Sequence, residues 1–289
     1  MAGPPELPVR SIHHLEDVMG TVVTIDVYTT DGRAGAELSR ELATARALLQ
    51  RADAVFSTWK PDSPVSRLRR GEITSAQAPA EVSEVLEQCA IARELSGGWF
   101  DPWAMPGGID PTGYVKGWAA QRALGAFRAS GVRGAIVNAA GDIASVGGLG
   151  HGTPFRIGIT DPSSPGRLAD VVYLTAAIAT SGTYERGNHL IDPHSGRPAG
   201  RVASASVTGP DLGLADALAT ALAVAGEPGL DLIEALDGYE ALIIAIDGGR
   251  RWTEHFPFAP REASPPLWEP AEKTARSSVF ADSVFEDLG

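Results

Sequence analysis

The sequence TSGTYERGNHLIDPHSGRP spans residues 180–198, and one short strand later LADALATALAVAG spans residues 214–226. The first stretch places a histidine, a carboxylate and several hydroxyls on a segment punctuated by Gly and Pro, which is typical of a loop. The second is an Ala-rich helical pattern in which Asp216 and Thr220 are four residues apart and therefore share one helix face. Such a pair offers hard oxygens, and Mg²⁺ is held by one or two carboxylates together with substrate phosphates. The ordinary alternative is an acid near a helix start and a core threonine.

Around this pair the chain alternates between strand-like and helical patterns. Strands and helices mix without a regular βαβ repeat, so we expect an α+β fold of mixed sheets with packed helices, a single compact unit of two intimately joined halves. We expect helices over residues 34–56, 80–95, 115–131, 214–225 and 228–236, and strands over residues 21–28, 135–148, 155–162, 169–180, 201–209 and 239–247. The expected organisation is an N-terminal extension (1–17), one domain (18–258) and a polar, Pro-containing tail (259–289).

Composition excludes some partners. Lys and Arg number 24 against 36 Asp and Glu, which gives a formal net charge of −12 and a pI near 4.9. Nucleic acid is therefore not an expected partner, because phosphate backbones are bound by clustered cations. The single cysteine, Cys89, cannot form an internal disulfide. Any small phosphate ligand must be held by local donors or by a metal.

The sequence predicts no membrane association. Residues 1–14 hold neither the apolar run of a signal peptide nor a cysteine for lipid attachment. No stretch approaches the roughly 18 to 20 continuous apolar residues of a membrane span. We therefore expect a cytoplasmic protein.

Other site motifs are not supported. The glycines at 146–152 do not fit G-x-G-x-x-G, and the chain has no P-loop motif. His189, Asp192 and His194 could be drawn as a zinc site, but there is no ligating cysteine and no H-E-x-x-H helix. We therefore favour a structural or catalytic use of these residues over zinc binding.

Nine segments between Val18 and Phe256 match the motif order of one family. They are MGTVVTIDVY (19–28), FSTWKPDSPVSRL (56–68), GGWFDP (97–102), IDPTGYVKGWA (109–119), VNAAGDIASVGG (137–148), RIGITDP (156–162), TSGTYER (180–186), HLIDPHSGRP (189–198) and ADALATAL (215–222). In these segments the chain resembles the ApbE family, the FAD:protein FMN transferases. The resemblance implies that Mg²⁺ binds the FAD diphosphate, which is cleaved. FMN then passes as a phosphoester to a Thr or Ser hydroxyl of a target flavoprotein, and AMP is released.

The resemblance also implies roles for single residues. The metal would be held by Asp216, Thr220 and the backbone carbonyl of Gly113. Contacts to the cofactor would come from Met19, Trp59, Trp99, Phe100, Asp101, Asp110, Lys116 and Ile191. Among these, Met19 and Trp59 would contact the flavin, which a thioether and an aromatic face suit.

Each role has an ordinary alternative. Met19 and Trp59 could simply pack in the core. Gly113 and Asp110 could be turn residues beside Pro111, and Lys116 could be a solvated helix residue. His189 is the candidate for proton handling, since its titration range suits a general base acting on a hydroxyl. It could instead be a loop histidine that organises Asp192.

Two features depart from the family's pattern. Only seven residues, WAMPGGI at 103–109, stand where many members have a much longer segment, and Arg69 occupies the position of an Asn. Some members hydrolyse FAD to FMN and AMP, so an FAD pyrophosphatase is the alternative within the enzyme class. A flavin-binding carrier without chemistry is the alternative outside it, although a carrier has no need of a metal on the diphosphate.

Overall fold

The structure is a computed structural model, and it describes residues 10–29, 38–149, 154–164, 166–182, 190–200 and 202–260. The described residues up to Ala259 belong to one compact unit. The expected tail lies outside the described residues from residue 261 onward. Within the described part of the chain, no helix is both long and apolar enough to cross a bilayer.

The centre of this unit is one eight-stranded sheet in which every neighbouring pair is antiparallel. Its strands, in spatial order, are β1 (Arg10–Val18), β2 (Thr21–Thr29), β3 (Gly134–Ala139), β4 (Asp142–Gly147), β7 (Ala177–Ser181), β10 (Val202–Gly209), β11 (Glu240–Ala245) and β12 (Arg250–Trp252). Two small hairpins accompany it, β5 (Phe155–Thr160) with β6 (Leu168–Leu174), and β8 (Ile191–Asp192) with β9 (Arg197–Pro198).

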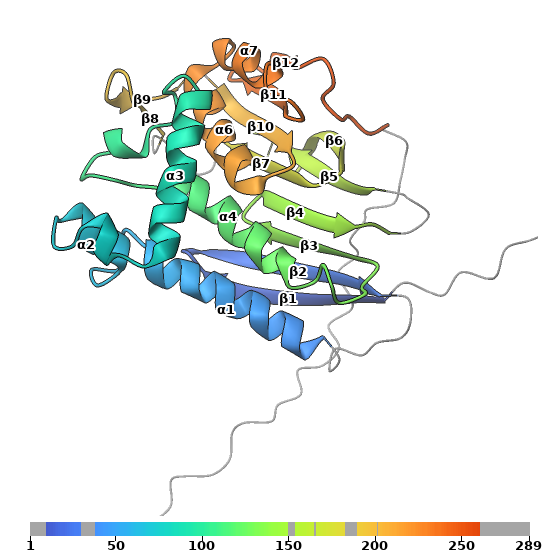
Figure 1. The fold of residues 1–289 in the computed structure, drawn as a ribbon. Coiled ribbons are helices and arrows are strands. Elements are labelled where there is room, and N and C mark those ends of the chain that lie inside the picture. The colour runs from blue at the N-terminus through green and yellow to red at the C-terminus, as the bar shows by residue number, and fades with distance from the viewer. Residues whose placement is uncertain are drawn as a thin grey trace, which may run out of the picture. The chain divides into compact units, whose positions relative to one another are not determined.

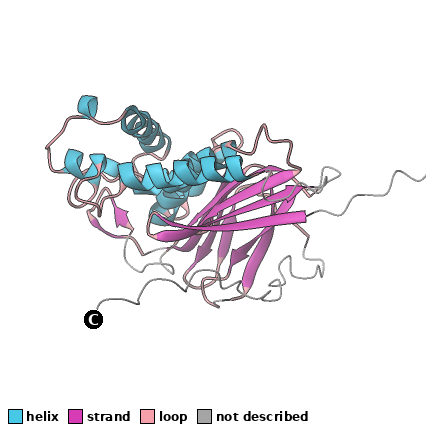
Figure 2. Cartoon of the chain, turned by 90° about the horizontal axis from the view of Figure 1, so that it is seen from below, coloured by secondary structure: helices cyan, strands magenta, loops and turns pink. Residues whose placement is uncertain are grey.

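Helices gather on one face of this sheet (Figures 1 and 2). They are α1 (Ser39–Phe56), α2 (Pro64–Arg69), α3 (Ala80–Leu95), α4 (Thr112–Gly125), α6 (Leu212–Ala225) and α7 (Pro228–Glu234), with short 3₁₀ turns η1 (Ser75–Gln77) and η2 (Pro102–Ala104). Helix α6 is buried almost all round, as its uniformly apolar sequence requires. The expected α+β fold is confirmed.

The central strands β4, β7, β10 and β11 bury side chains on both faces of the sheet. Side chains alternate between the faces of a strand, so Ala241 and Ile243 of β11 join the core under the helices, whereas Leu242 and Ile244 face the other side. There the β5–β6 hairpin supplies the second core layer through residues such as Phe155. Two cores, one on each face, therefore fix the sheet.

Three sequence expectations are refined. The expected N-terminal extension covers residues 1–17, but Arg10–Val18 form β1, which pairs along its whole length with β2. The stretch 169–180 contains two strands in different sheets, because β6 pairs with β5 while β7 joins the large sheet. The helix expected over 115–131 begins at Thr112 and ends at Gly125.

Candidate active site

Helices α4 and α6 cross very closely, and two glycines make this possible. A Cβ on Gly117 would lie 2.3 Å from the backbone oxygen of Leu212, and one on Gly213 would lie 2.8 Å from the ring of Tyr114. Real side chains cannot occupy such distances, so only glycine fits at both positions. The crossing brings the N-terminal half of α4 against residues 212–220 of α6, where the predicted metal ligands lie.

Asp216 is almost fully buried at this crossing, with 2% of its surface exposed. Its Oδ2 accepts a hydrogen bond from the Gly117 N–H at 3.0 Å. In a regular helix that N–H would serve the Gly113 carbonyl. Asp216 and the Gly113 carbonyl therefore compete for the same donor, the Gly117 N–H. The Gly113 oxygen keeps a lone pair with which it can bind another partner.

Thr220 lies one turn along α6, next to Gly113. A Cβ on Gly113 would be 3.4 Å from the Thr220 hydroxyl and 3.3 Å from the ring of Phe100. Ser181, the last residue of β7, places its hydroxyl 3.2 Å from the same Thr220 oxygen. The structure thus brings Gly113, Asp216 and Thr220 together, and adds Ser181 of the TSGTYER segment, to which the sequence alone assigns no role.

Lys116 is also held at this place. Its Nζ pairs with Oδ2 of Asp142, the fully buried first residue of β4. The second oxygen of Asp142 accepts the Thr180 N–H at 3.2 Å. Asp142 is not one of the predicted site residues, but it lies in the family-like segment 137–148. This ion pair fixes the position of the partly exposed lysine.

The same end of the sheet carries two strained turns. Met19 (φ 55°) and Ala140 (φ 53°) are the residues other than glycine that have positive φ in the described part of the chain. Each opens a two-residue hairpin loop completed by a glycine, Gly20 or Gly141. The antiparallel order places both turns at the sheet end where β7 finishes at Ser181. Backbone strain of this kind gathers at functional sites.

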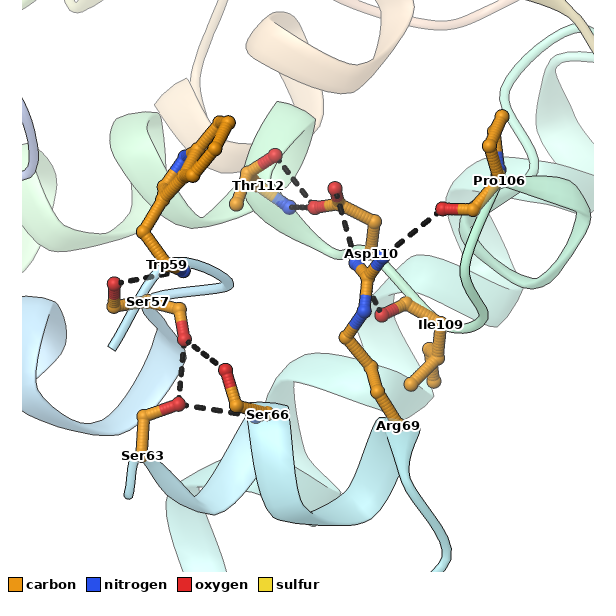
Figure 3. Close-up of polar contacts among 9 residues, drawn as sticks. All are labelled: Ser57, Trp59, Ser63, Ser66, Arg69, Pro106, Ile109, Asp110 and Thr112. Carbon is orange, nitrogen blue, oxygen red and sulfur yellow. Dashed lines mark hydrogen bonds and ion pairs between the residues drawn. The ribbon is translucent and has the colours of Figure 1, made fainter. Parts of the chain in front are cut away.

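Trp59 lies on the loop that joins α1 to α2, and it is 94% exposed. The loop is built on serines: the Ser57 oxygens accept bonds from Trp59 N–H at 3.3 Å and from the Ser66 hydroxyl at 3.0 Å. Ser63 caps α2 through the Ser66 N–H at 3.0 Å. Figure 3 shows the indole pointing away from this serine cluster. The core-packing alternative for Trp59 is therefore excluded.

The segment after α3 holds four more predicted residues. Phe100 is buried against Gly113, and Trp99 is half-buried with its ring 4.4 Å from that of His194. Asp101 accepts a 2.6 Å bond from Arg93 and caps η2 through the Trp103 N–H. Asp110 accepts from the Thr112 N–H and hydroxyl at 3.1 and 2.6 Å, and so fixes the start of α4.

Ile191 is half-buried in β8, beside the last predicted loop. Asp192 accepts bonds from the His194 N–H and the Ser195 hydroxyl, and the hydroxyl bond in particular lowers the pKa of this carboxyl.

His189, the predicted general base, lies outside the described residues. Within the described ranges, no group of three or more His, Cys, Asp or Glu side chains could hold a metal. The predicted ligand set, with one carboxylate, one hydroxyl and one carbonyl, is of another kind and suits a hard cation.

Cys89 is not a candidate nucleophile. Burial raises the pKa of its thiol to about 12, and the nearby Asp216 and Asp110 carboxylates act in the same direction. A thiol of that pKa is almost wholly protonated at neutral pH and therefore inert.

Comparison with known proteins points to one family. Residues 19–107 and 104–243 match the model of the ApbE family. A protein named FAD:protein FMN transferase from Rhodobacter capsulatus is 38% identical over 151 residues, 49% of this chain and 28% of the relative. One of the same name from Vibrio cholerae serotype O1 is 33% identical over 153 residues, 49% of this chain and 46% of the relative. The chain thus spans less than half the length of these curated relatives.

Solved structures share the fold. The flavin transferase ApbE from Vibrio cholerae superposes with a TM-score of 0.72 at 24% identity, covering 85% of this chain and 97% of that one. The ApbE protein from Thermotoga maritima gives 0.73 at 23% identity, with 85% and 97% covered. The apo form of the Pseudomonas stutzeri flavinyl transferase ApbE gives 0.71 at 24% identity, with 85% and 95% covered.

Proposed function

The chain belongs to the ApbE family, and from this premise we propose that it is an FAD:protein FMN transferase. The matched curated relatives carry that name. The observation that carries the proposal is the meeting of Gly113, Asp216 and Thr220 at the α4–α6 crossing, with Lys116 presented beside them by Asp142. Such a place supplies hard oxygens and a cation, which a diphosphate substrate needs.

In the proposed reaction, a Thr or Ser hydroxyl of a target flavoprotein attacks the FMN-side phosphorus of FAD. A bond forms between that oxygen and phosphorus, the bond to the bridging oxygen breaks, and AMP leaves. The hydroxyl proton must be accepted, and His189 is the proposed general base. The charge on the non-bridging oxygens must be offset, and Lys116 is the protein's cation for this.

Mg²⁺ is the proposed metal, and the donors present fit it. Asp216, Thr220 and the Gly113 carbonyl would hold the ion, and bound there it would neutralise diphosphate charge. The Gly117 N–H fixes the Asp216 carboxylate, and Ser181 fixes the Thr220 hydroxyl. The ligands are thereby oriented by partners that lie outside the ligand set.

The flavin is proposed to lie against Trp59 and Met19, with the remainder of FAD along Trp99, Phe100, Asp101, Asp110 and Ile191. An almost fully exposed indole on a hydrogen-bonded loop offers a large flat face to an isoalloxazine ring.

The decisive experiment incubates the protein with FAD, Mg²⁺ and a flavoprotein acceptor from the same source. A denaturing gel then reports covalent fluorescent flavin, and chromatography reports AMP. Labelled acceptor together with AMP supports the transferase. AMP and FMN without label would identify a pyrophosphatase, and neither product would identify a carrier.

A further inference from the structure

The short segment 103–109 is folded around one side chain, that of Arg69. Its guanidinium donates to the backbone oxygens of Pro106 at 2.9 Å and Ile109 at 3.2 Å, and it lies 3.3 Å from Oδ2 of Asp110. Gly107 packs directly on it, since a Cβ there would lie 2.7 Å from Nη2. Figure 3 shows Arg69 rising from α2 into the middle of these three partners.

We propose that Arg69 is a positioning residue, which sets the short segment 103–109 and Asp110 in place beside Gly113, the candidate metal ligand of α4. This inference rests on the proposed function. The short segment 103–109 and Arg69, the two departures from the family's pattern, contact each other directly, and the arginine adds support from α2 to the segment's own backbone bonds.

Asp110 connects Arg69 to the start of α4. One oxygen of Asp110 faces Arg69, while the other accepts the N–H and hydroxyl of Thr112, the first residue of α4. Gly113 follows directly, so Arg69 fixes the helix end from which Gly113 and Lys116 reach the site. A rotation of Asp110 would release both contacts at once.

Arg69 acts here through its shape as well as its charge. Its side chain is only 16% exposed, and it contacts three acceptors that lie in different directions around the planar fork. A lysine carries the same charge on a single nitrogen and cannot reach all three acceptors together. The guanidinium of Arg69 is thus occupied by acceptors of the protein itself.

The test compares Arg69→Met and Arg69→Lys with the parent by two readouts. Hydrogen exchange should speed up in peptides covering residues 103–112 in both variants, without FAD and without any assay of transfer. FAD affinity, measured by isothermal titration, should fall roughly tenfold in both, the consequence of losing about 1.4 kcal/mol of preorganised contacts. Asp110→Asn should weaken binding less when Arg69 is already replaced, because the two act through one contact.

Arg67→Met is the matched control. Arg67 lies on the same helix and faces Glu72 at 3.6 Å on the surface, so its loss should change neither readout. Unchanged exchange over 103–112 in Arg69→Met would overturn the proposal. Full recovery of FAD affinity in Arg69→Lys would overturn it too, because charge alone would then suffice. A parent protein that binds no FAD would count against the proposed function, whereas the exchange result would still decide the role of Arg69 in positioning.

Discussion

A substitution at Asp216 can remove the charge of the side chain while keeping its shape. Asp216→Asn keeps the shape and an oxygen for the Gly117 N–H, but removes the charge that would face the cation. We expect near-parent stability and a fall in transfer rate of roughly 100-fold or more, since metal stabilisation is worth several kcal/mol. Initial rates at saturating Mg²⁺, with melting curves alongside, measure both effects.

The matched control lies at the start of the same helix. Asp211 caps α6 through the Leu214 N–H at 2.8 Å, which Asn can also accept, and its second oxygen accepts from Gln121 at 2.9 Å. Asp211→Asn should therefore cost about 1 kcal/mol of stability through the Gln121 bond and leave the transfer rate unchanged. Unchanged transfer in Asp216→Asn would remove this carboxylate from the site.

Substitutions at Trp59 should change FAD binding without changing the stability of the fold. Because its side chain is 94% exposed, Trp59→Ala leaves no core cavity and the melting temperature should stay unchanged. FAD binding should weaken by about 1–3 kcal/mol if the indole stacks on the flavin, as for other ring stacking on aromatic side chains. Trp59→Phe should retain most of the affinity. Titration of FAD against the three proteins checks this, and equal affinities would show that the ring lies elsewhere.

Part of the candidate site could be predicted from the sequence, and the reason is periodicity. Asp216 and Thr220 share a face because four residues make about one helical turn. The Lys116–Asp142 pair could not be predicted, since its partners are 26 residues apart and meet only when α4 packs on the sheet. The Arg69 contacts depend likewise on the loop conformation of residues 106–110.

At the level of elements, the α4–α6 crossing depends on the absence of a side chain at Gly117. Gly117→Ala would place a Cβ 2.3 Å from the Leu212 oxygen, so the helices must separate. We expect a loss of about 1–3 kcal/mol in unfolding free energy and reduced FAD transfer, because Gly113 and Asp216 move apart. Urea unfolding and transfer rates measure the two losses.

Gly125 is the matched control, because it ends the same helix and a Cβ there would meet nothing within 4 Å. Gly125→Ala should therefore be neutral or stabilise by about 0.4–1 kcal/mol. A Gly117→Ala protein as stable and active as this control would contradict the close crossing.

The contact between β1 and α1 should depend on pH. Glu16 is 8% exposed and accepts bonds from Arg46 and Gln50, both at 2.7 Å, and from His14 at 3.2 Å. Burial would raise the pKa of this carboxyl, but these bonds outweigh it and lower the pKa overall. A lowered folded-state pKa means that the unfolded chain binds the proton first. The stabilisation is therefore present above the unfolded pKa and is lost as pH falls through the folded one.

We expect Glu16→Gln to be less stable than the parent at neutral pH, and this difference to shrink on acidification below about pH 4. Urea unfolding across pH 3 to 7 measures it, with the exposed Glu87→Gln as a control that changes little. A difference that stayed constant with pH would show that the Glu16 charge contributes nothing.

For the molecule as a whole, the α+β class follows from the mixing of strand and helix patterns, but the sheet order does not. Strand β7 lies between β4 and β10, whereas β6 pairs with β5. This arrangement depends on the packing of Ile178 and Leu174 into one core, and that packing exists only in the folded chain. The strand signal of β1 is weak because two of its four inward positions, His14 and Glu16, are polar. Glu16 is satisfied by Arg46 and Gln50 of α1, and His14 bonds to Glu16 itself. A strand is harder to recognise in a sequence when its buried side chains are polar and hydrogen-bonded instead of apolar.

That refinement of the domain boundary leads to a test by truncation. A protein lacking residues 1–18 loses β1, whose nine paired positions cover the edge of β2, and it leaves the Met19–Gly20 turn without its first strand. Each backbone hydrogen bond contributes about 0.5–1.5 kcal/mol net, so we expect the unfolding free energy to fall by about 3 kcal/mol or more. In a domain of this size that loss lowers the melting temperature by roughly 6–12 °C. The newly exposed edge should also favour aggregation.

Deletion of residues 1–8 alone keeps β1 and is the matched control, so its melting temperature should equal that of the parent. FAD titration adds a second readout, because the positive φ of Met19 is held by pairing on both sides of the turn. The longer deletion should therefore weaken FAD binding even at temperatures where it remains folded. Equal stability and equal FAD affinity in the two truncated proteins would place the start of the domain at Met19, and β1 would then be an accessory strand.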